Sequence, residues 1–390
     1  MAGALSRRPL QTSDFRLPTL TIVVPFHRDG AMLARCLDAL AVRPRSADLI
    51  VVADGATDDC RAVAVDRGAR VVAIAERSGP AVARNAAAAE AAGEVLVFVD
   101  ADVAIAGGAL ERLTQLFADR PRMSAVFGAY DDSPADPGFA SQYKNLTHAF
   151  VHRESAGPSR TFWAGFGAVR RDAFVAVGGF DERFTRPSVE DIDLGYRLSA
   201  AGCDVTLDPS LQACHLKRWT LASMFASDVR DRGIPWTQLA LRYGALRGGL
   251  NLQPKYRWSI VLAYVGAGAA ILALRDRRFA IVTAASAVAL AALGWRLYAF
   301  LARRRGLWFA VRAFPVHVLH HLANGVSFAI GAALFVGART FGLRTRATLA
   351  VHPWQEGQEG QEGQEGQEGQ VGQVGRQVGQ VGRGRVARGR

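Results

Sequence analysis

Two aspartates, Asp100 and Asp102, follow the apolar run "VLVFV" of residues 95–99 and are separated by a single alanine. A run without polar side chains is typical of a strand buried in a sheet, so both carboxylates would stand at its end. Such a pair can hold a hard divalent cation through oxygen, and the cation commonly takes phosphates as its other ligands. Taken alone the pattern is weak, because D-x-D occurs again at Asp191 and Asp193 and is more often a turn or a helix cap.

The elements that would position this pair are alternating strands and helices. Apolar strand patterns occur in "LTIVVP", "LIVVAD", "RVVAI" and "VLVFVD", and helical patterns lie between them. This alternation predicts a parallel sheet that is covered on both faces. In such sheets ligands bind outside the carboxyl ends of the strands, so we expect Pro25, Asp54, Asp100 and Asp102 along one rim.

These motifs, in their order along the chain, resemble the family 2 glycosyltransferases, whose catalytic domain has the GT-A fold. The resemblance covers residues 19–237 and rests on "TIVVPFHRD", "VVADGATDD", "SGPAVARNAAAAEAAGEVLVFVDADV", "FWAGFGAVRRDAFVAVGGFDERF" and "VEDIDLGYRLSAAG". The second segment departs from the family's D-G-S-T-D pattern by Ala56. The resemblance implies an α/β fold with a GT-A-type doubly wound mixed, mostly parallel sheet, followed here by transmembrane helices and a disordered tail.

The same resemblance implies a site for a nucleotide-sugar donor. Asp54 would contact the nucleobase, Pro25 would shape the loop beneath it, and Arg84 would lie close to the nucleotide. Asp100 and Asp102 would hold Mg2+ or Mn2+ against the diphosphate, with Asp102 favoured as the direct ligand. A divalent cation and a nucleotide sugar are therefore the expected cofactor and donor.

The E-D motif at Glu190 and Asp191 would supply the catalytic carboxylates, with Asp191 as the general base. An inverting transfer needs a carboxylate that takes the proton of the acceptor hydroxyl, while the metal stabilises negative charge on the departing nucleoside diphosphate. The same acids also suit the first turn of a helix, because negative side chains interact favourably with the positive end of the helix dipole. Both interpretations hold if the helix begins at the rim of the sheet, where its first acids can stabilise the helix and also act as the base.

A basic and aromatic segment, "HLKRW" at residues 215–219, follows the predicted catalytic motifs. We interpret it as a mobile segment that closes over the diphosphate, with His215, Arg218 and Trp219 as substrate-binding residues and Arg218 offering charge. Its ending resembles the Q-x-x-R-W motif of processive polysaccharide synthases, with His215 in the place of glutamine. The alternative is a basic stretch beside the membrane, anchored by an aromatic side chain.

The excess positive charge lies between residues 251 and 350, which hold thirteen Lys or Arg and one acid, Asp276. The residues before 251 and those after 350 each sum to zero. The basic residues interrupt long apolar runs, which is the pattern of arginines that flank membrane segments. We therefore expect a membrane partner and no nucleic-acid partner.

Three apolar runs cover residues 258–274, 279–302 and 315–338. Because a helical span needs about 20 apolar residues, the first is marginal, the second is long enough, and the third is long but polar in its first half. Two or three spans are expected. Arginines on both sides of the second run leave the topology open.

Five histidines could in principle bind a metal ion, but no carboxylate accompanies them to complete a set of ligands. In the third apolar run, His317, His320 and His321 share one helix face, and we expect them to face solvent or lipid headgroups. His148 and His152 lie four residues apart in "YKNLTHAFVH", and we expect polar surface there.

The predicted domain boundaries are an N-terminal extension 1–18, a GT-A catalytic domain 19–237, a juxtamembrane linker 238–257, a transmembrane region 258–346 and a disordered Gln/Gly-rich tail 347–390. The tail is a low-complexity repeat with too little apolar content to offset the entropy of ordering. No secretory signal is recognised at the start, and the four cysteines show no CxxC spacing, which favours reduced thiols in a cytoplasmic setting.

These expectations combine into a membrane-anchored, metal-dependent, inverting glycosyltransferase of hexosyltransferase type. It would move a sugar from a nucleotide donor to a lipid-linked or other membrane-associated acceptor, with an integral anchor in the cell membrane and the catalytic domain in the cytoplasm. The alternatives are a synthase that extends a polysaccharide and a non-catalytic membrane scaffold with the same fold. A scaffold has no physical need for acids at Asp54, Asp100, Asp102 and Asp191. The sequence leaves the donor sugar and the oligomeric state open.

Overall fold

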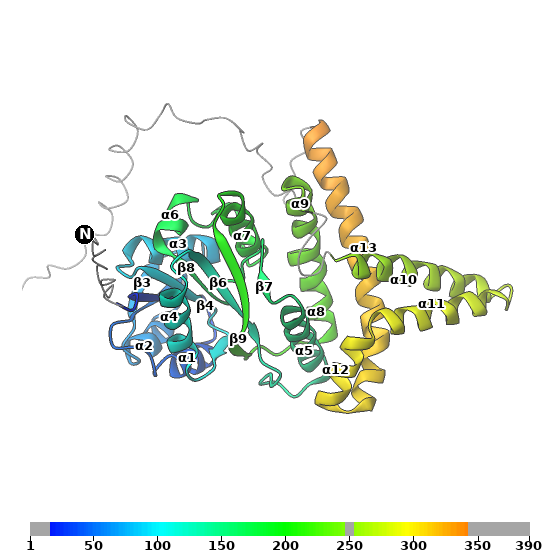
Figure 1. The fold of residues 1–390 in the computed structure, drawn as a ribbon, viewed down its shortest axis with the longest axis horizontal. Coiled ribbons are helices and arrows are strands. Elements are labelled where there is room, and N and C mark those ends of the chain that lie inside the picture. Colours follow the sequence, from blue (N-terminus) through cyan, green and yellow to red (C-terminus); the bar gives the residue numbers. More distant parts are fainter. Residues whose placement is uncertain (1–15, 246–252, 342–390) are drawn as a thin grey trace, which may run out of the picture. The chain divides into compact units, whose positions relative to one another are not determined.

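A mixed sheet of nine strands forms the centre of the catalytic region in the described part of the chain (Figure 1). The computed structural model describes residues 16–245 and 253–341. The predicted tail and most of the predicted N-terminal extension lie outside the described residues, as do parts of the linker and the end of the transmembrane region. The strand order is β3-β2-β1-β4-β8-β6-β9-β5, and β7 pairs with β9. The predicted GT-A-type α/β fold is confirmed.

The strands are short, and most of their residues are buried. They are β1 Leu20–Phe26, β2 Asp48–Asp54, β3 Arg70–Ile74, β4 Val95–Val99, β5 Val103–Ile105, β6 Met123–Tyr130, β7 Gly157–Pro158, β8 Phe166–Arg170 and β9 Asp204–His215. The helices that connect them are α1 Gly30–Ala39, α2 Asp58–Val65, α3 Pro80–Glu90, α4 Ala109–Asp119, α5 Phe139–Glu154, α6 Arg171–Ala176 and α7 Glu190–Ala200.

The first half of the sheet is parallel, as the alternation of strands and helices predicts. β1 pairs in parallel with both β2 and β4, and β2 pairs in parallel with β3. Valine, isoleucine and leucine fill these strands because their side chains pack well on both faces of a covered sheet. The carboxyl ends of the four strands therefore meet at one edge.

The second half of the sheet is mixed, because β8 runs antiparallel to both β4 and β6. β9 is parallel to β6 and then continues antiparallel to the short strand β5. In that last pairing Val103 lies opposite His215. The end of β9 is thereby brought beside the residue that follows Asp102, although more than a hundred residues separate them in the chain.

Seven helical segments follow β9 in the described part of the chain. They are α8 Leu221–Ala226, the π-helix η1 Ser227–Gly233, α9 Ile234–Arg242, α10 Pro254–Ala273, α11 Phe279–Leu293, α12 Trp295–Arg305 and α13 Leu307–Phe341. α10 and α11 lie side by side (Figure 1). By length and composition α10 and α13 can each cross a membrane, and α11 with α12 is a third candidate only if the bent pair forms one span. The expected two or three candidate spans are therefore present.

The second apolar run is not one straight helix. It breaks at Gly294, and α11 and α12 are bent by 70° relative to each other. α12 carries arginines that bind the catalytic domain: Arg296 Nη1 lies 2.7 Å from Glu154 Oε2, and Arg305 Nη2 donates to the carbonyl of Asp132 at 2.7 Å. These ion-pair and hydrogen-bond partners hold α12 against the catalytic domain, which sequence hydropathy alone does not reveal.

α13 approaches the catalytic domain through small residues. A Cβ atom on Gly233 would lie 2.6 Å from Ser327 Oγ, and one on Gly331 would lie 2.7 Å from the Cβ atom of Thr237. Real Cβ atoms do not come so close, so these glycines allow η1 and α9 to contact α13 nearly backbone to backbone. The contact fixes one wall of the cavity described below.

Candidate active site

The residues predicted to share one rim do so. Asp54 ends β2, Asp100 and Asp102 occupy the turn between β4 and β5, and Pro25 is the next-to-last residue of β1. Pro25 lies within the sheet register, opposite Val52. The parallel first half of the sheet is the physical reason for this convergence, because it turns all these strand ends toward the same edge.

Asp54 is buried, and its carboxylate binds protein backbone. The N–H groups of Ser78 and Gly79 donate to its Oδ1 and Oδ2 at 2.6 and 2.8 Å. Gly79 has φ 98°, and a Cβ atom there would lie 2.6 Å from the carbonyl oxygen of Thr185, so glycine is required. Asp54 thus holds the loop that begins α3, and its contact with a nucleobase stays a prediction.

Arg84 joins two parts of the predicted site. This buried side chain of α3 donates from Nη1 to Glu190 Oε1 at 2.9 Å and from Nη2 to Asp100 Oδ1 at 2.7 Å. Burial alone would lower the pKa of Arg84, but Asp100 and Glu190 raise it above its ordinary value. The second oxygen of Glu190 accepts the N–H of Ser188 at 2.8 Å. Glu190 is therefore engaged as a structural anion, and its predicted catalytic role stays a prediction.

Replacing Arg84 by methionine is expected to lower the free energy of unfolding by about 3–5 kcal/mol, because it leaves the buried Glu190 carboxylate without its partner. Thermal unfolding of the purified protein in detergent measures the effect. Arg112→Met is the matched control, since Arg112 is exposed and lies 3.7 Å from Asp208 in a weak surface pair. Equal melting temperatures for both variants would contradict the idea that Arg84 stabilises the fold by joining Glu190 to Asp100.

Asp102 faces His215 across the β5–β9 pairing. Asp102 Oδ2 lies 3.5 Å from His215 Nε2, and the ring stacks on Tyr130 with centroids 4.6 Å apart. His215 Nδ1 lies 2.8 Å from Asn145 Oδ1, whose own amide nitrogen donates to the carbonyl of Ser141 at 2.8 Å. The Asn145 oxygen must therefore accept, so His215 carries its proton on Nδ1.

The proton on Nδ1 leaves Nε2 facing the Asp102 carboxylate. In the neutral form of His215 the lone pair of Nε2 points at this carboxylate, an arrangement that a cation bound between them would stabilise. The donor set of one carboxylate oxygen and one imidazole nitrogen suits Mn2+ or Mg2+ when phosphate oxygens and water complete the shell. Within residues 16–245 and 253–341, no cluster of three or more His, Cys, Asp or Glu forms a complete protein cage for a metal. The residues present thus fit a cation that is shared with a phosphate ligand.

Asp191 is the second residue of α7 and follows Glu190, the partner of Arg84. Its Oδ2 accepts the N–H of Ala164 at 3.1 Å, and its accessible surface faces a cavity. Burial and, after it, the Glu190 carboxylate raise the pKa of Asp191 to about 7, against opposing effects that include Arg84. A carboxylate with a pKa near neutrality is suited to accept a proton from a hydroxyl group. The neighbouring Asp193 is buried and pairs with Arg197, so it is structural.

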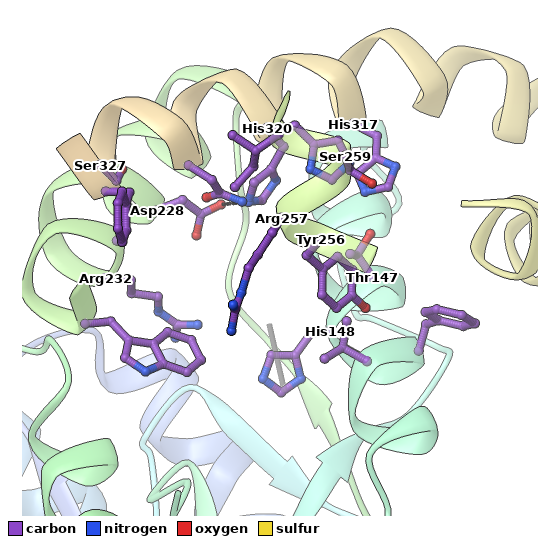
Figure 2. A pocket seen from close by; sticks show the side chains of 18 of the residues that line it. Thr147, His148, Asp228, Arg232, Tyr256, Arg257, Ser259, His317, His320 and Ser327 are labelled. Atoms are coloured by element: carbon purple, nitrogen blue, oxygen red, sulfur yellow. Dashed lines mark ion pairs between the residues drawn. The ribbon is translucent and has the colours of Figure 1, made fainter. Parts of the chain in front are cut away.

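The cavity extends from Asp191 to the C-terminal helices and encloses about 830 Å³. Its catalytic-domain wall comes from α5 and η1, and its other walls come from α10 and α13 (Figure 2). The α10 and α13 walls include Ile260, Tyr264 and Phe328. The volume lies within the range of about 300–1,000 Å³ that is typical of pockets for drug-sized ligands.

The histidines lie inside the protein, against expectation. His152 is buried and bonds the carbonyl of Gly128 through Nδ1 at 3.0 Å, while His148 lines the cavity beside it. On α13, His317 and His321 are buried, and His320 Nε2 lies 3.6 Å from Asp228 Oδ2. The prediction of solvent- or headgroup-facing histidines was therefore wrong, because α13 packs this face on neighbouring elements: His317 Nδ1 lies 2.7 Å from the Tyr298 hydroxyl of α12, and His320 faces Asp228 of η1.

The segment of residues 215–219 is divided between packing and solvent. Trp219 is buried, and its backbone N–H donates to Ser141 Oγ at 2.8 Å. Arg218 is exposed, with its Nε 3.9 Å from Asp136 Oδ2. Closure of this segment over a diphosphate stays a prediction. Sequence reasoning missed Asn145, Tyr130 and Arg232, whose roles depend on neighbours that lie far away in the chain.

Comparison with known proteins assigns the catalytic region. Residues 21–178 match the sequence profile described as glycosyl transferase family 2, and residues 144–217 match the one described as the N-terminal domain of galactosyltransferase. With the observed fold, this shows that the chain contains a family 2 glycosyltransferase domain of the GT-A type.

Several curated proteins are similar over this region. Validoxylamine A glucosyltransferase of Streptomyces hygroscopicus is 28% identical over 236 residues, which cover 51% of this chain and 52% of the relative. Pre-mycofactocin glycosyltransferase of Mycobacterium tuberculosis is 28% identical over 265 residues, which cover 65% of this chain and 54% of the relative. The chain thus spans about half the length of these curated relatives.

Among solved structures, a mannosyltransferase from Pyrobaculum calidifontis in complex with GDP-Man and Mn2+ has a similar fold. The TM-score is 0.50 at 21% sequence identity, and the match covers 83% of this chain and 91% of the mannosyltransferase. At this identity the likeness shows the fold alone.

Proposed function

We propose that the protein transfers one sugar, with inversion, from a nucleotide-sugar donor to a hydroxyl group of a membrane-associated acceptor. The observation that carries the proposal is that Arg84 bonds both Asp100, two residues before the Asp102 that faces His215, and Glu190, the neighbour of Asp191. Such an arrangement offers a cation site for the leaving diphosphate and a base for the incoming hydroxyl within one site. The glycosyltransferase relatives and the GDP-Man and Mn2+ of the mannosyltransferase support a sugar-nucleotide donor and a divalent cation.

In this mechanism Asp102 and His215 would hold Mn2+ or Mg2+, with Asp100 beside them. A bound cation supplies stabilisation of the negative charge on the departing nucleoside diphosphate. The hydroxyl oxygen of the acceptor bonds to the anomeric carbon of the donor sugar while the bond from that carbon to the diphosphate breaks. Asp191 accepts the proton that the hydroxyl group loses. Arg84 is a positioning residue, because it ties Asp100 of the donor side to the start of the helix that carries Asp191.

The acceptor is assigned to the membrane because the cavity at Asp191 is walled by the candidate spanning helices α10 and α13. A further relative, N-acetylglucosaminyl-diphospho-decaprenol L-rhamnosyltransferase of Mycobacterium tuberculosis, is 38% identical over 96 residues, or 31% of its length. Its name describes a lipid-linked acceptor. We infer that this protein is an integral membrane enzyme whose catalytic domain faces the cytoplasm, where a nucleotide donor would reach the rim.

The test is incubation of the purified full chain with radiolabelled nucleotide sugars, Mn2+ and a membrane lipid extract. We expect label in the organic phase as a product that carries one added sugar, and no product when the cation is chelated. Long polymeric products would instead indicate a polysaccharide synthase. Absence of both transfer and metal-dependent donor binding across all donors would indicate a scaffold.

A further inference from the structure

The cavity behind Asp191 is lined by both apolar and polar side chains. The candidate spanning helices α10 and α13 contribute Ile260 and Phe328 together with polar residues such as Ser259 and His320. The catalytic domain contributes Asp191 and Arg232 together with aromatic residues such as Phe162 and Trp163. A ligand that fills the cavity must therefore combine an apolar chain with a polar group.

η1 supplies two of the charged residues of this lining. In this π-helical turn Asp228 and Arg232 both line the cavity (Figure 2). π-helical turns are rare and frequently occur at functional sites, because the wider turn changes the direction of the side chains it carries. Gly233 ends the turn against Ser327 of α13, so the position of η1 is fixed by the membrane helix.

Arg232 is one of the cations that line the cavity, and Asp228 and Asp191 are among the acids that act on it electrostatically. Asp228 is already paired with Lys144 and lies near His320, and Arg296 is paired with Glu154. Within the described ranges, no carboxylate forms a direct ion pair with Arg232, which is exposed to the space of the cavity. A guanidinium group in a partly apolar cavity favours a bound anion, and phosphate matches its planar set of donors.

Other polar groups converge on the same space. Figure 2 shows Arg257 extending into the pocket from the top of the view and His148 lying below it. His148 Nδ1 and Thr147 Oγ1 have no hydrogen-bond partner within the described residues. Buried polar atoms without partners are costly, and these two belong to residues that line the cavity.

We propose that this cavity binds a lipid phosphate, with the phosphate at Arg232, the lipid chain along α10 and α13, and a sugar hydroxyl of the lipid-linked acceptor at Asp191. The inference rests on the proposed function and specifies its acceptor. A phosphate acting as the nucleophile would need no base, whereas a hydroxyl group does. A free phosphate would make no use of the apolar wall.

Binding of decaprenyl phosphate and decaprenol to the detergent-solubilised full chain, followed by native mass spectrometry, tests the proposal without turnover. The wild-type protein should bind the phosphate at least about tenfold more tightly than the alcohol, as expected for a charge-assisted contact. Arg232→Ala should remove this preference, and Arg232→Lys should restore part of it. Arg230→Ala is the matched control, because Arg230 lies two residues before Arg232, is exposed and pairs with Asp231. This variant should keep the preference for the phosphate.

Three outcomes would overturn the proposal. They are equal binding of the two lipids, an unchanged preference in Arg232→Ala, and displacement of decaprenyl phosphate by inorganic phosphate at equal concentration, which would indicate a free-phosphate site. Mn2+-dependent binding of nucleotide sugars, measured on the same preparations without lipid, tests the proposed function separately. Loss of lipid selectivity with donor binding intact would therefore reject this inference alone, and loss of donor binding in the wild-type protein would reject the proposed function.

Discussion

Exchange of Asp191 for asparagine is expected to lower kcat for sugar transfer by about a hundredfold to ten-thousandfold, the range by which a positioned general base accelerates a reaction. Asparagine has nearly the same shape but cannot take the proton of the acceptor hydroxyl. Its side-chain oxygen can still accept the N–H of Ala164, so the start of α7 should keep its position. Single-turnover transfer assays with saturating donor measure the chemical step directly.

The pH dependence of the transfer rate is a second test of Asp191 as the general base. The pKa of Asp191 is raised to about 7, so its carboxyl group is mostly protonated below that pH and mostly ionised above it. Transfer should therefore fall by about tenfold for each pH unit below the pKa and level off above it. In Asp191→Asn, the residual rate should no longer show this fall at acidic pH, which is the acidic limb of the profile.

Asp172→Asn is the matched control, because Asp172 is an exposed carboxylate on α6 and does not line the Asp191 cavity. We expect this variant to keep both the rate and the acidic limb of the wild-type profile. A rate in Asp191→Asn within about threefold of wild type, far below the effect of losing a general base, would show that another group accepts the proton.

Exchange of Asp102 for alanine is expected to abolish the part of nucleotide-sugar binding that depends on Mn2+. The reason is the small donor set: the described residues contain no cluster of three or more His, Cys, Asp or Glu for a metal, and His215 Nε2 lies 3.5 Å from Asp102 Oδ2. Loss of the carboxylate would leave a single neutral imidazole, which holds Mn2+ weakly. Calorimetric titration with each nucleotide sugar, with and without Mn2+, measures the difference.

Asp119→Ala removes an exposed carboxylate at the end of α4 and should bind the donor as the wild-type protein does. His215→Ala should resemble Asp102→Ala, because both side chains would hold the same cation. If metal-dependent binding survives in Asp102→Ala but is lost in Asp100→Ala, Asp100 rather than Asp102 is the metal ligand.

Local sequence patterns were sufficient for the rim of the site. The apolar strands that end at Asp54 and Asp100 are recognisable because buried parallel strands are apolar on both faces, and their carboxyl ends must meet at one edge. For the same reason the sequence predicted the neighbourhood of Pro25 and Asp102. Helix starts are also local, and the acids at the start of α7 lie where the helix dipole favours them.

The C-terminal helices show where hydropathy stops being informative. The sequence indicated apolar segments, but it did not indicate that Gly294 would break the second run or that the arginines of α12 would bind the catalytic domain. It also placed the histidines of α13 at a polar surface, although His317 and His321 are buried and His317 contacts Tyr298 of α12. A helix pattern shows that one face is polar, but not which partner that face meets.

By itself the sequence determined the α/β class, the rim of acidic residues and the presence of membrane-type helices, because these follow from short-range periodicity and strand ends. Only the tertiary structure decided that Arg84 joins Glu190 to Asp100, that Asn145 sets the tautomer of His215, and that Arg232 faces a cavity closed by α10 and α13. The partners in each of these contacts lie on elements that are separate in the chain. Their pairing depends on how the sheet and the helices pack, which no local pattern records.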